Sequence, residues 1–261
     1  MKLSVIIPVL NERTTLPDTL THLESNRVAH EIIVVDGGSD DGTREWLATQ
    51  SRARVVHSAR GRGAQLNAGA RQASGDTLLF LHGDCTLPHD AAARLKAALS
   101  SPAVVGGAFH VRFAGNSSLT LRAVAAGINV RSSLRRSATG DQAIFVRRSI
   151  YDAVGGFAEW PLFEDVDFVT RIKRLGRFVV IPSQVPISPR RYLNRGIWST
   201  VVLIHALRAA YWAGVSPFVL ASWFTDVRPH ISGAPRPSPG WFDTNPPSSI
   251  ASDFRVMSRI P

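Results

Sequence analysis

The segments Leu-Ser-Val-Ile-Ile-Pro-Val-Leu-Asn-Glu (residues 3–12) and Glu-Ile-Ile-Val-Val-Asp-Gly-Gly-Ser-Asp-Asp-Gly-Thr (residues 31–43) decide the fold class. Each begins as a run of apolar, mostly β-branched residues and ends in polar, turn-forming residues. Such apolar runs are typical of parallel strands buried on both faces, and parallel sheets bind ligands at the carboxyl ends of their strands. The pattern therefore predicts two strands with a nucleotide site at their carboxyl edge.

Residues at the two strand ends are the candidates for contact with that nucleotide. Pro8 is expected to stop the first strand, because proline has no N–H to donate to a ladder. Asp36 is placed to accept hydrogen bonds from a base or ribose, and the glycines after it permit close approach of the backbone. The alternative is that residues 36–43 form only a turn and a helix cap. The nucleotide-binding candidates here are Pro8, Val9, Asn11, Glu12, Asp36, Gly38 and Ser39.

Strand-like and helix-like stretches alternate along the first part of the chain, which predicts βαβ units, a mostly parallel sheet and an α/β fold. Strands are expected near residues 3–7, 31–35, 54–57 and 77–81, with helices near 14–25, 41–50 and 64–73. We expect one domain over residues 1–225, with a nucleotide half (1–85), an acceptor half (86–195) and a C-terminal helical region (196–225). Residues 226–261 contain scattered prolines and serines and are expected to form a disordered tail.

The two opening segments resemble those of the family 2 glycosyltransferases, which have the A-type glycosyltransferase fold, a Rossmann-like sheet flanked by helices. The similarity continues through residues 67–76, 79–84, 155–157 and 164–171, so that it covers roughly residues 3–195. The motifs are specific as a set, although each is weak alone. The resemblance implies transfer of a sugar from a nucleotide-diphosphate sugar to an acceptor hydroxyl, with inversion at the anomeric carbon.

Asp84 is the candidate metal ligand. The apolar run of residues 78–81 emerges at His82, Gly83 and Asp84, and a carboxylate there can hold a divalent cation, Mg²⁺ or Mn²⁺, against a diphosphate. The family commonly has Asp-x-Asp at this place, whereas this chain has Leu-His-x-Asp, as in a bacterial subgroup. His82 is expected to ligate, bind ribose or pack. Gly83 joins the nucleotide-binding candidates, and Cys85 is interpreted as a packing residue.

The acids Glu164 and Asp165 are the candidate catalytic residues. They lie in the first turn of an expected helix, where the helix dipole favours the ionised form needed in a base. By resemblance, Asp165 is the general base, and Glu164 positions the acceptor or serves as the alternate base. The alternative is an ordinary helix start whose acids pair with Arg171.

Further candidates contact phosphate or the acceptor. Arg62 lies in a Gly-Arg run that precedes a helix and is the choice for the nucleotide, with a solvated loop as the alternative. The acceptor or phosphate candidates are Asp141, Trp160, Arg190 and Arg191.

The chain has 30 basic and 20 acidic residues, a net charge of +10, which favours anionic partners. No basic and aromatic motif for nucleic acid stands out, so the expected partners are the sugar donor, a hydroxyl acceptor with a lipid-linked one among the options, and an anionic membrane surface. One cysteine and no signal-peptide pattern favour the cytoplasm, with the inner membrane face as an option. Residues 198–224 are aromatic and apolar, and fit either an interfacial helix or one packed on the domain.

Two rival functions remain at this point. A sugar nucleotidyltransferase also uses a metal-bound nucleotide, but it requires a Gly-rich, Lys-containing loop after the first strand, where this chain has residues 8–13. A membrane-associated module that binds a nucleotide sugar without turnover is the non-enzymatic rival. The retained acids Asp36, Asp84 and Asp165 argue against it.

Overall fold

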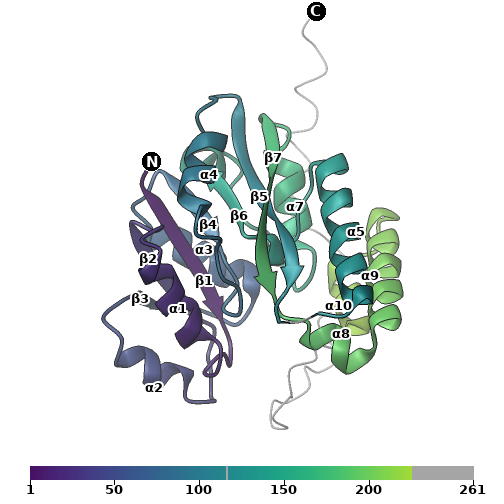
Figure 1. Ribbon diagram of the computed structural model, residues 1–261, viewed down its shortest axis with the longest axis horizontal. Coiled ribbons are helices and arrows are strands. Elements are labelled where there is room, and N and C mark those ends of the chain that lie inside the picture. The colour runs from purple at the N-terminus through teal and green to yellow at the C-terminus, as the bar shows by residue number, and fades with distance from the viewer. Residues whose placement is uncertain (116, 225–261) are drawn as a thin grey trace, which may run out of the picture. The chain divides into compact units, whose positions relative to one another are not determined.

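Seven strands form one sheet in the order β3-β2-β1-β4-β6-β5-β7, in a computed structural model that describes residues 1–115 and 117–224 (Figure 1). Strand β6 runs antiparallel to β4 and β5, and the other neighbours pair in parallel. The predicted mostly parallel sheet is therefore confirmed, whereas the expected tail, residues 226–261, lies outside the described residues. The strands are β1 (Leu3–Val9), β2 (Glu31–Asp36), β3 (Arg54–His57), β4 (Thr77–Phe80), β5 (Val104–Phe113), β6 (Ile144–Arg147) and β7 (Arg177–Ile187).

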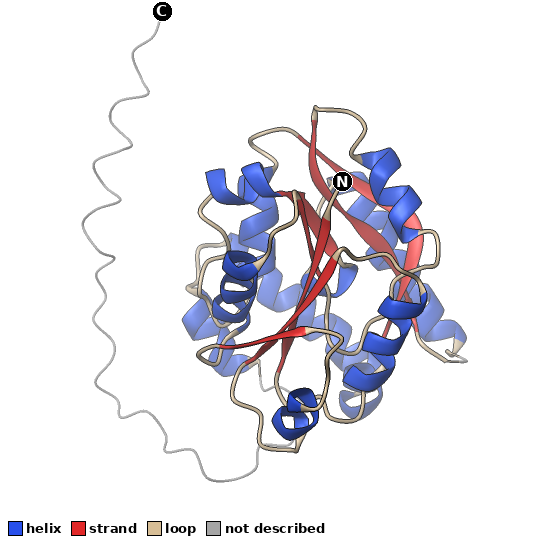
Figure 2. Cartoon of the chain, turned by 90° about the vertical axis from the view of Figure 1, so that its left-hand side faces the viewer, coloured by secondary structure: helices blue, strands red, loops and turns tan. Residues whose placement is uncertain are grey.

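Helices connect the strands and cover both faces of the sheet (Figure 2). They are α1 (Leu16–Ser25), α2 (Thr43–Ala48), α3 (Arg62–Gln72), α4 (Ala91–Ala98), α5 (Leu119–Arg135), α6 (Arg148–Ala153), α7 (Glu164–Ile172), α8 (Arg190–Arg195), α9 (Ile197–Trp212) and α10 (Pro217–Trp223), with a short 3₁₀ helix, η1 (Gly140–Gln142). None of the helices within residues 1–224 has the length and apolar character needed to cross a bilayer.

Alternation of side chains along β1 explains the two layers of helices. Val5 and Ile7 face one apolar cluster, which includes residues of α1, α4 and α5. Ile6 faces the other cluster, which includes residues of α3, α6 and α7. Because successive residues of a strand point to opposite faces, an apolar run must be covered on both sides. The sheet therefore lies between two packed layers of helices.

The expectation that Pro8 stops the first strand is wrong. Strand β1 continues to Val9, and Pro8 lies opposite Val35 of β2. The pairing of β1 with β4 ends at Ile6, whose carbonyl accepts from the amide of Leu81, while the carbonyl of Val9 points to the β2 side. The missing N–H of Pro8 therefore falls on the side where the ladder has already ended, so that no hydrogen bond is lost.

The C-terminal helices pack on the start of α7. Phe163, which precedes α7 with a φ of 65°, forms a small cluster with Leu207 of α9 and Leu220 of α10. Its ring lies 4.8 Å from that of Tyr211. Helices α9 and α10 therefore fix the position of the first turn of α7, which carries Glu164 and Asp165.

Candidate active site

Hydrogen bonds hold the loop of residues 36–43 together and attach it to Asn11, which follows β1. The carboxylate of Asp36, whose residue is only 1% exposed, accepts from the amides of Gly38 and Ser39 at 3.0 and 3.1 Å. The hydroxyl of Ser39 accepts from the amide of Asn11, and the side chain of Asn11 accepts from the amide of Asp40, each at 2.9 Å. Asp36 therefore shapes this loop, and direct contact of its carboxylate with a nucleotide stays a prediction.

Glu12 and Gly83 extend this network toward the end of β4. The amide of Glu12 donates to Thr43, and the carbonyl of Gly83 accepts from the hydroxyl of Thr19 at 2.9 Å. A Cβ on Gly83 would lie 3.4 Å from the Glu12 side chain. The segments after β1, β2 and β4 thus meet at one edge of the sheet, as the sequence predicts.

Gln65 joins β1 and β2 at this edge and was missed by the sequence analysis. Its side-chain amide donates to the carbonyls of Val9 and Val35, at 2.8 and 2.9 Å. A Cβ on Gly37 would lie 2.9 Å from the Gln65 side chain, so a larger residue there would displace the Gln65 amide from these carbonyls. The sequence offers little signal for this role, because α3 contains several other polar residues.

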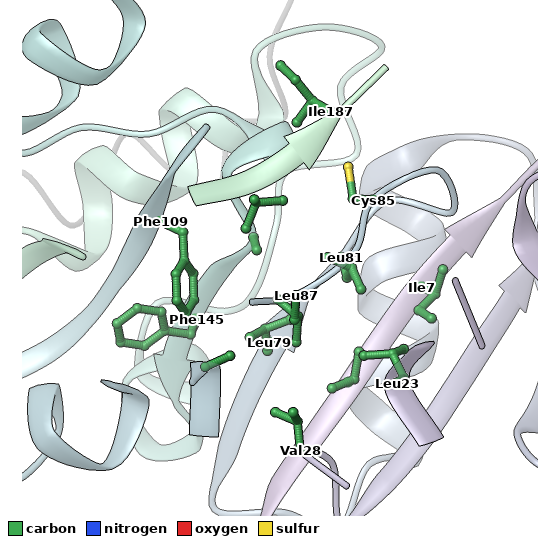
Figure 3. Close-up of a cluster of buried hydrophobic side chains, with 14 of the residues drawn as sticks. Ile7, Leu23, Val28, Leu79, Leu81, Cys85, Leu87, Phe109, Phe145 and Ile187 are labelled. Atoms are coloured by element: carbon green, nitrogen blue, oxygen red, sulfur yellow. The ribbon is translucent and has the colours of Figure 1, made fainter. Parts of the chain in front are cut away.

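His82, Asp84 and Cys85 form a compact group after β4. One potential ligand atom of each lies within 4.8 Å of the others. Cys85 is buried, and burial, together with the nearby charge of Asp84, raises the pKa of its thiol well above the usual value. Figure 3 shows Cys85 among the apolar side chains of the cluster that also contains Leu81, as expected for a packing residue. The carboxylate of Asp84 and the imidazole of His82 are the remaining donors.

A contact through Gly140 brings Asp165 to this group. The amide of Gly140 donates to the Asp165 carboxylate at 2.6 Å, and a Cβ on Gly140 would lie only 2.9 Å from Nε2 of His82. Residues distant in sequence therefore meet around η1. We call the set His82, Asp84, Asp141 and Asp165 the central site.

Asp165 has the electrostatics of a base. It is 8% exposed, and burial first, then the charge of Glu164, raises the pKa of Asp165 to about 7. The charge of Arg62 and the amides of Gly140 and Val166 oppose this shift. A carboxylate with a pKa near neutrality can accept a proton and release it at physiological pH.

Glu164 and Asp167 have other partners. Arg62 of α3 donates to the buried carboxylate of Glu164 at 3.1 Å, an ion pair that joins α3 to α7. Arg171 pairs with Asp167 at 2.7 Å. The alternative, in which helix-start acids pair with Arg171, thus describes Asp167, whereas Asp165 accepts from Gly140 in the central site.

Among the acceptor candidates, Asp141 belongs to the central site, and the others lie on two other segments of the chain. Asp141 accepts from the hydroxyl of Thr139 at 2.6 Å, and its charge acts on Cys85. Trp160 is half-buried in the loop before α7. Arg190 and Arg191 begin α8, where Arg191 lies over the ring of Phe224 at 4.8 Å.

Asn67 is a second position missed by the sequence analysis. Its carbonyl oxygen accepts from the amide of Phe157 and the hydroxyl of Tyr151, and its amide group donates to the carbonyl of Phe157. A Cβ on Gly63 would lie 2.3 Å from the carbonyl oxygen of Ala158. Helix α3 therefore holds the loop that leads into α7.

A groove of about 640 Å³ lies elsewhere, between β5 and α5. It is lined by residues such as His110, Arg112, Arg122 and Val130, and by none of the predicted site residues. The candidate site is instead an edge of the sheet crowded with polar groups.

Comparison with known proteins identifies the family of the chain. Residues 4–158 match the model of glycosyl transferase family 2. The chain is 30% identical over 167 residues to glycosyltransferase AglE of Haloferax volcanii, covering 59% of this chain and 55% of that protein. It is 35% identical over 107 residues to undecaprenyl-phosphate 4-deoxy-4-formamido-L-arabinose transferase of Salmonella choleraesuis, covering 37% and 33%. The chain spans between a third and about half the length of these relatives.

Solved structures share the fold. A mannosyltransferase from Pyrobaculum calidifontis, in complex with GDP-Man and Mn²⁺, aligns with a TM-score of 0.62 at 21% identity, covering 85% of this chain and 68% of that one. Glucosyl-3-phosphoglycerate synthase from Mycobacterium tuberculosis, in complex with Mn²⁺, UDP and glucosyl-3-phosphoglycerate, aligns with a TM-score of 0.55 at 22% identity, covering 70% of each chain.

Proposed function

The chain belongs to glycosyl transferase family 2 and has the A-type glycosyltransferase fold predicted from its sequence, and on this basis we propose that it transfers a sugar from a nucleotide-diphosphate sugar to an acceptor hydroxyl. One observation carries the proposal. Asp165, a buried carboxylate with a pKa of about 7, lies at the start of α7 and is joined through Gly140 to the group around Asp84.

In the proposed reaction Asp165 acts as the general base. It takes the proton of the acceptor hydroxyl while the hydroxyl oxygen attacks the anomeric carbon. The new carbon–oxygen bond forms as the bond to the diphosphate breaks, and the nucleoside diphosphate leaves with the bonding electrons. A single displacement inverts the anomeric carbon. Glu164, paired with Arg62, holds the first turn of α7 and raises the pKa of its neighbour.

The donor set after β4 fits a divalent cation. The Asp84 carboxylate would hold Mn²⁺ or Mg²⁺ together with diphosphate oxygens and waters. The imidazole of His82 would add a ligand for Mn²⁺ rather than for the harder Mg²⁺, and the protonated thiol of Cys85 would not compete. When bound, the cation supplies positive charge to the leaving diphosphate. The two similar structures contain Mn²⁺. The arginines of the site, Arg62, Arg190 and Arg191, are proposed to add to the same stabilisation.

In this proposal the two halves of the domain bind different substrates. The segments after β1, β2 and β4, in residues 1–85, bind the nucleotide, and residues 86–195 bind the acceptor. The two halves share the central site through Gly140 and through the ion pair of Arg62 and Glu164.

Donor and turnover are tested together. We would screen UDP-, GDP- and dTDP-sugars by thermal shift with Mn²⁺, since a ligand that binds the folded state raises its Tm. Transfer would then be followed with the stabilising donor. Stabilisation by one donor together with product formation supports the proposal, and binding without turnover favours the non-enzymatic module. Formation of a nucleotide sugar from a nucleoside triphosphate and a sugar phosphate would favour the nucleotidyltransferase.

We propose that the acceptor is lipid-linked. We also propose that the chain acts at the cytoplasmic face of a membrane. Helix α9 exposes Trp198, Val202 and Trp212, which are 70%, 66% and 64% exposed, and Figure 1 places α9 at the rim of the fold. Arg190 and Arg195 lie on the preceding α8. Exposed tryptophans beside arginines suit an interface with anionic lipid. A relative named as an undecaprenyl-phosphate transferase supports this choice.

Vesicle binding tests the membrane proposal. Co-sedimentation with phosphatidylglycerol vesicles should exceed that with phosphatidylcholine vesicles, and Trp198→Ser with Trp212→Ser should reduce it severalfold. The buried Leu207 of the same helix is left intact, so the fold is retained. Equal sedimentation of the double variant and the unaltered chain would exclude α9 as the membrane contact.

A further inference from the structure

Arg131 of α5 is a partly buried cation whose hydrogen-bonding capacity is little used. Its Nε is buried and has no hydrogen-bond partner among residues 1–115 and 117–224. The guanidinium makes one long contact, 3.5 Å, to the hydroxyl of Ser132, and no carboxylate of the described chain lies within ion-pair distance of it. A buried charge without a partner is costly to the fold. Such a guanidinium is suited to an anion that arrives as a ligand.

Arg131 lies next to the central site. Ser132, the residue after it, donates its hydroxyl to the side-chain oxygen of Gln142 in η1 at 3.1 Å, which joins α5 to the loop that carries Gly140 and Asp141. Burial lowers the pKa of Arg131, and the charges of Asp141 and then Tyr192 and Asp165 act in the opposite direction. The guanidinium is therefore within reach of the charges of Asp141, Tyr192 and Asp165.

Tyr192 of α8 is a second polar residue near Arg131, since the charge of each acts on the other. Its residue is buried, and its ring packs edge-on against Phe113 with a centroid separation of 5.0 Å. Burial, with the charge of Asp141, raises the pKa of Tyr192 to about 12, while Arg191 and Arg131 lower it. The hydroxyl is therefore protonated at neutral pH and available as a donor.

We propose that Arg131 and the hydroxyl of Tyr192 form a phosphate-binding subsite of the central site. A guanidinium offers forked donors that match phosphate oxygens, and a phenol adds a third donor from another direction. Arg191, whose charge also acts on Tyr192, adds to the positive potential. The inference rests on the proposed sugar transfer, which supplies two sources of the phosphate: the diphosphate of the donor and a phosphate carried by the acceptor.

The competing explanation is that Arg131 only balances the charges of Asp141 and Asp165. In that case its replacement changes the stability of the fold but not the affinity for phosphate. The exposed Arg122 on the same helix offers a matched control, since Arg122→Gln removes the same charge from α5 at a distance of nine positions.

The test is calorimetric titration of the unaltered chain, Arg131→Gln, Arg131→Lys and Arg122→Gln with UDP and GDP in the presence of Mn²⁺, and with inorganic phosphate. Arg131→Gln is expected to weaken binding of one of these probes at least tenfold. Arg131→Lys keeps the positive charge but loses the paired N–H donors of the guanidinium, so it is expected to weaken binding of that probe less. Arg122→Gln is expected to leave the binding unchanged.

Two patterns distinguish the sources of the phosphate. The subsite belongs to the donor if Arg131→Gln binds the nucleoside diphosphate more weakly and the unaltered chain, once loaded with the diphosphate, binds no inorganic phosphate. The subsite belongs to the acceptor if Arg131→Gln binds the nucleoside diphosphate as tightly as the unaltered chain does. In that case the unaltered chain loaded with diphosphate binds inorganic phosphate, and loaded Arg131→Gln does not. If both affinities of Arg131→Gln stay within twofold of the unaltered chain, the subsite does not exist.

If Arg131→Gln does not fold, Tyr192→Phe replaces it in the titrations. This variant keeps the aromatic ring against Phe113 and removes only the hydroxyl. It should weaken the same probe severalfold, and unchanged binding would overturn the proposal. Failure of the unaltered chain to bind any nucleotide sugar would reject the proposed transfer, whereas the titration with inorganic phosphate still decides the role of Arg131.

Discussion

The loop of residues 36–43 and the central site both bury an aspartate, yet they hold it differently. Asp36 accepts from the amides of its own loop and has a cation nearby, with Nε of Arg44 at 3.7 Å. Asp165 also accepts from two amides, but its neighbour in sequence is Glu164, whose negative charge adds to burial in raising the pKa. The first arrangement stabilises a loop, and the second brings the pKa of Asp165 to about 7, as the proposed base requires.

The difference shows that hydrogen bonding alone does not identify a catalytic acid. Both carboxylates are satisfied by backbone amides, so a count of hydrogen bonds would treat them alike. The charges around them differ, because the Glu164 charge raises the pKa of Asp165 whereas Asp36 has Arg44 as a neighbour. Neighbouring charges also distinguish Arg131. The charges of Asp141 and Asp165 act on its guanidinium, yet neither acid forms an ion pair with it within the described residues.

The largest expected effect is on turnover. Asp165→Asn keeps the shape of the side chain but removes the base, so the rate of transfer should fall about 10²- to 10⁴-fold while donor affinity changes little. Transfer kinetics and donor titration measure the two quantities. Asp167→Asn on the same helix is the control, because Asp167 pairs with Arg171, and it should retain most of the turnover. Equal losses in the two variants would remove the distinction between the acids.

The next effect concerns the metal. Asp84→Asn should weaken Mn²⁺-dependent donor binding about 10- to 100-fold, because it removes the only carboxylate of the group formed with His82 and Cys85. Cys85→Ala is the control and should keep the response to Mn²⁺, since a protonated thiol is no ligand for it. Titration with Mn²⁺ and a nucleoside diphosphate measures both. Loss of the metal response in Cys85→Ala alone would assign the ion to the thiol.

A smaller effect is expected in the pH profile. Because Asp165 must be ionised to act as a base, kcat/KM should rise with pH and level off above its pKa of about 7, losing about tenfold per unit below it. Glu164→Gln removes the charge that raises this pKa, so the midpoint should move to lower pH. A midpoint that stays in place or rises would show that Glu164 does not tune Asp165.

The smallest effects are on stability, and they should differ in sign between the two aspartates. Asp36→Asn places an amide group among backbone donors and should cost about 1–3 kcal/mol, a loss of several degrees in Tm. Asp165 has a folded pKa above its unfolded value of 3.8, so its ionisation destabilises the fold progressively as pH rises from about 4 to 7, and fully above 7.

Asp165→Asn removes that penalty and should raise the Tm at pH 8, with little change at pH 4. Thermal melts of both variants at the two pH values measure the contrast. Two variants that both lose stability at pH 8 would contradict the electrostatic account of Asp165.

The sequence predicts the sheet and much of the site because local patterns carry that information. Apolar runs ending in Asp36 and Asp84 indicate parallel strands with polar ends, and acids before an apolar helical pattern indicate the start of α7. Gln65, Asn67 and Arg131 were missed, since their roles depend on contacts with residues far away in the chain. Pro8 was misjudged because its effect depends on where the neighbouring strand ends.

A crystal structure with Mn²⁺ and the nucleoside diphosphate that stabilises the chain most tests the central claim directly. The account predicts a nucleotide against the loop of residues 36–43, the ion on Asp84, and the carboxylate of Asp165 facing the side where the acceptor enters. A nucleotide bound in the groove between β5 and α5, with no ion at Asp84, would contradict it.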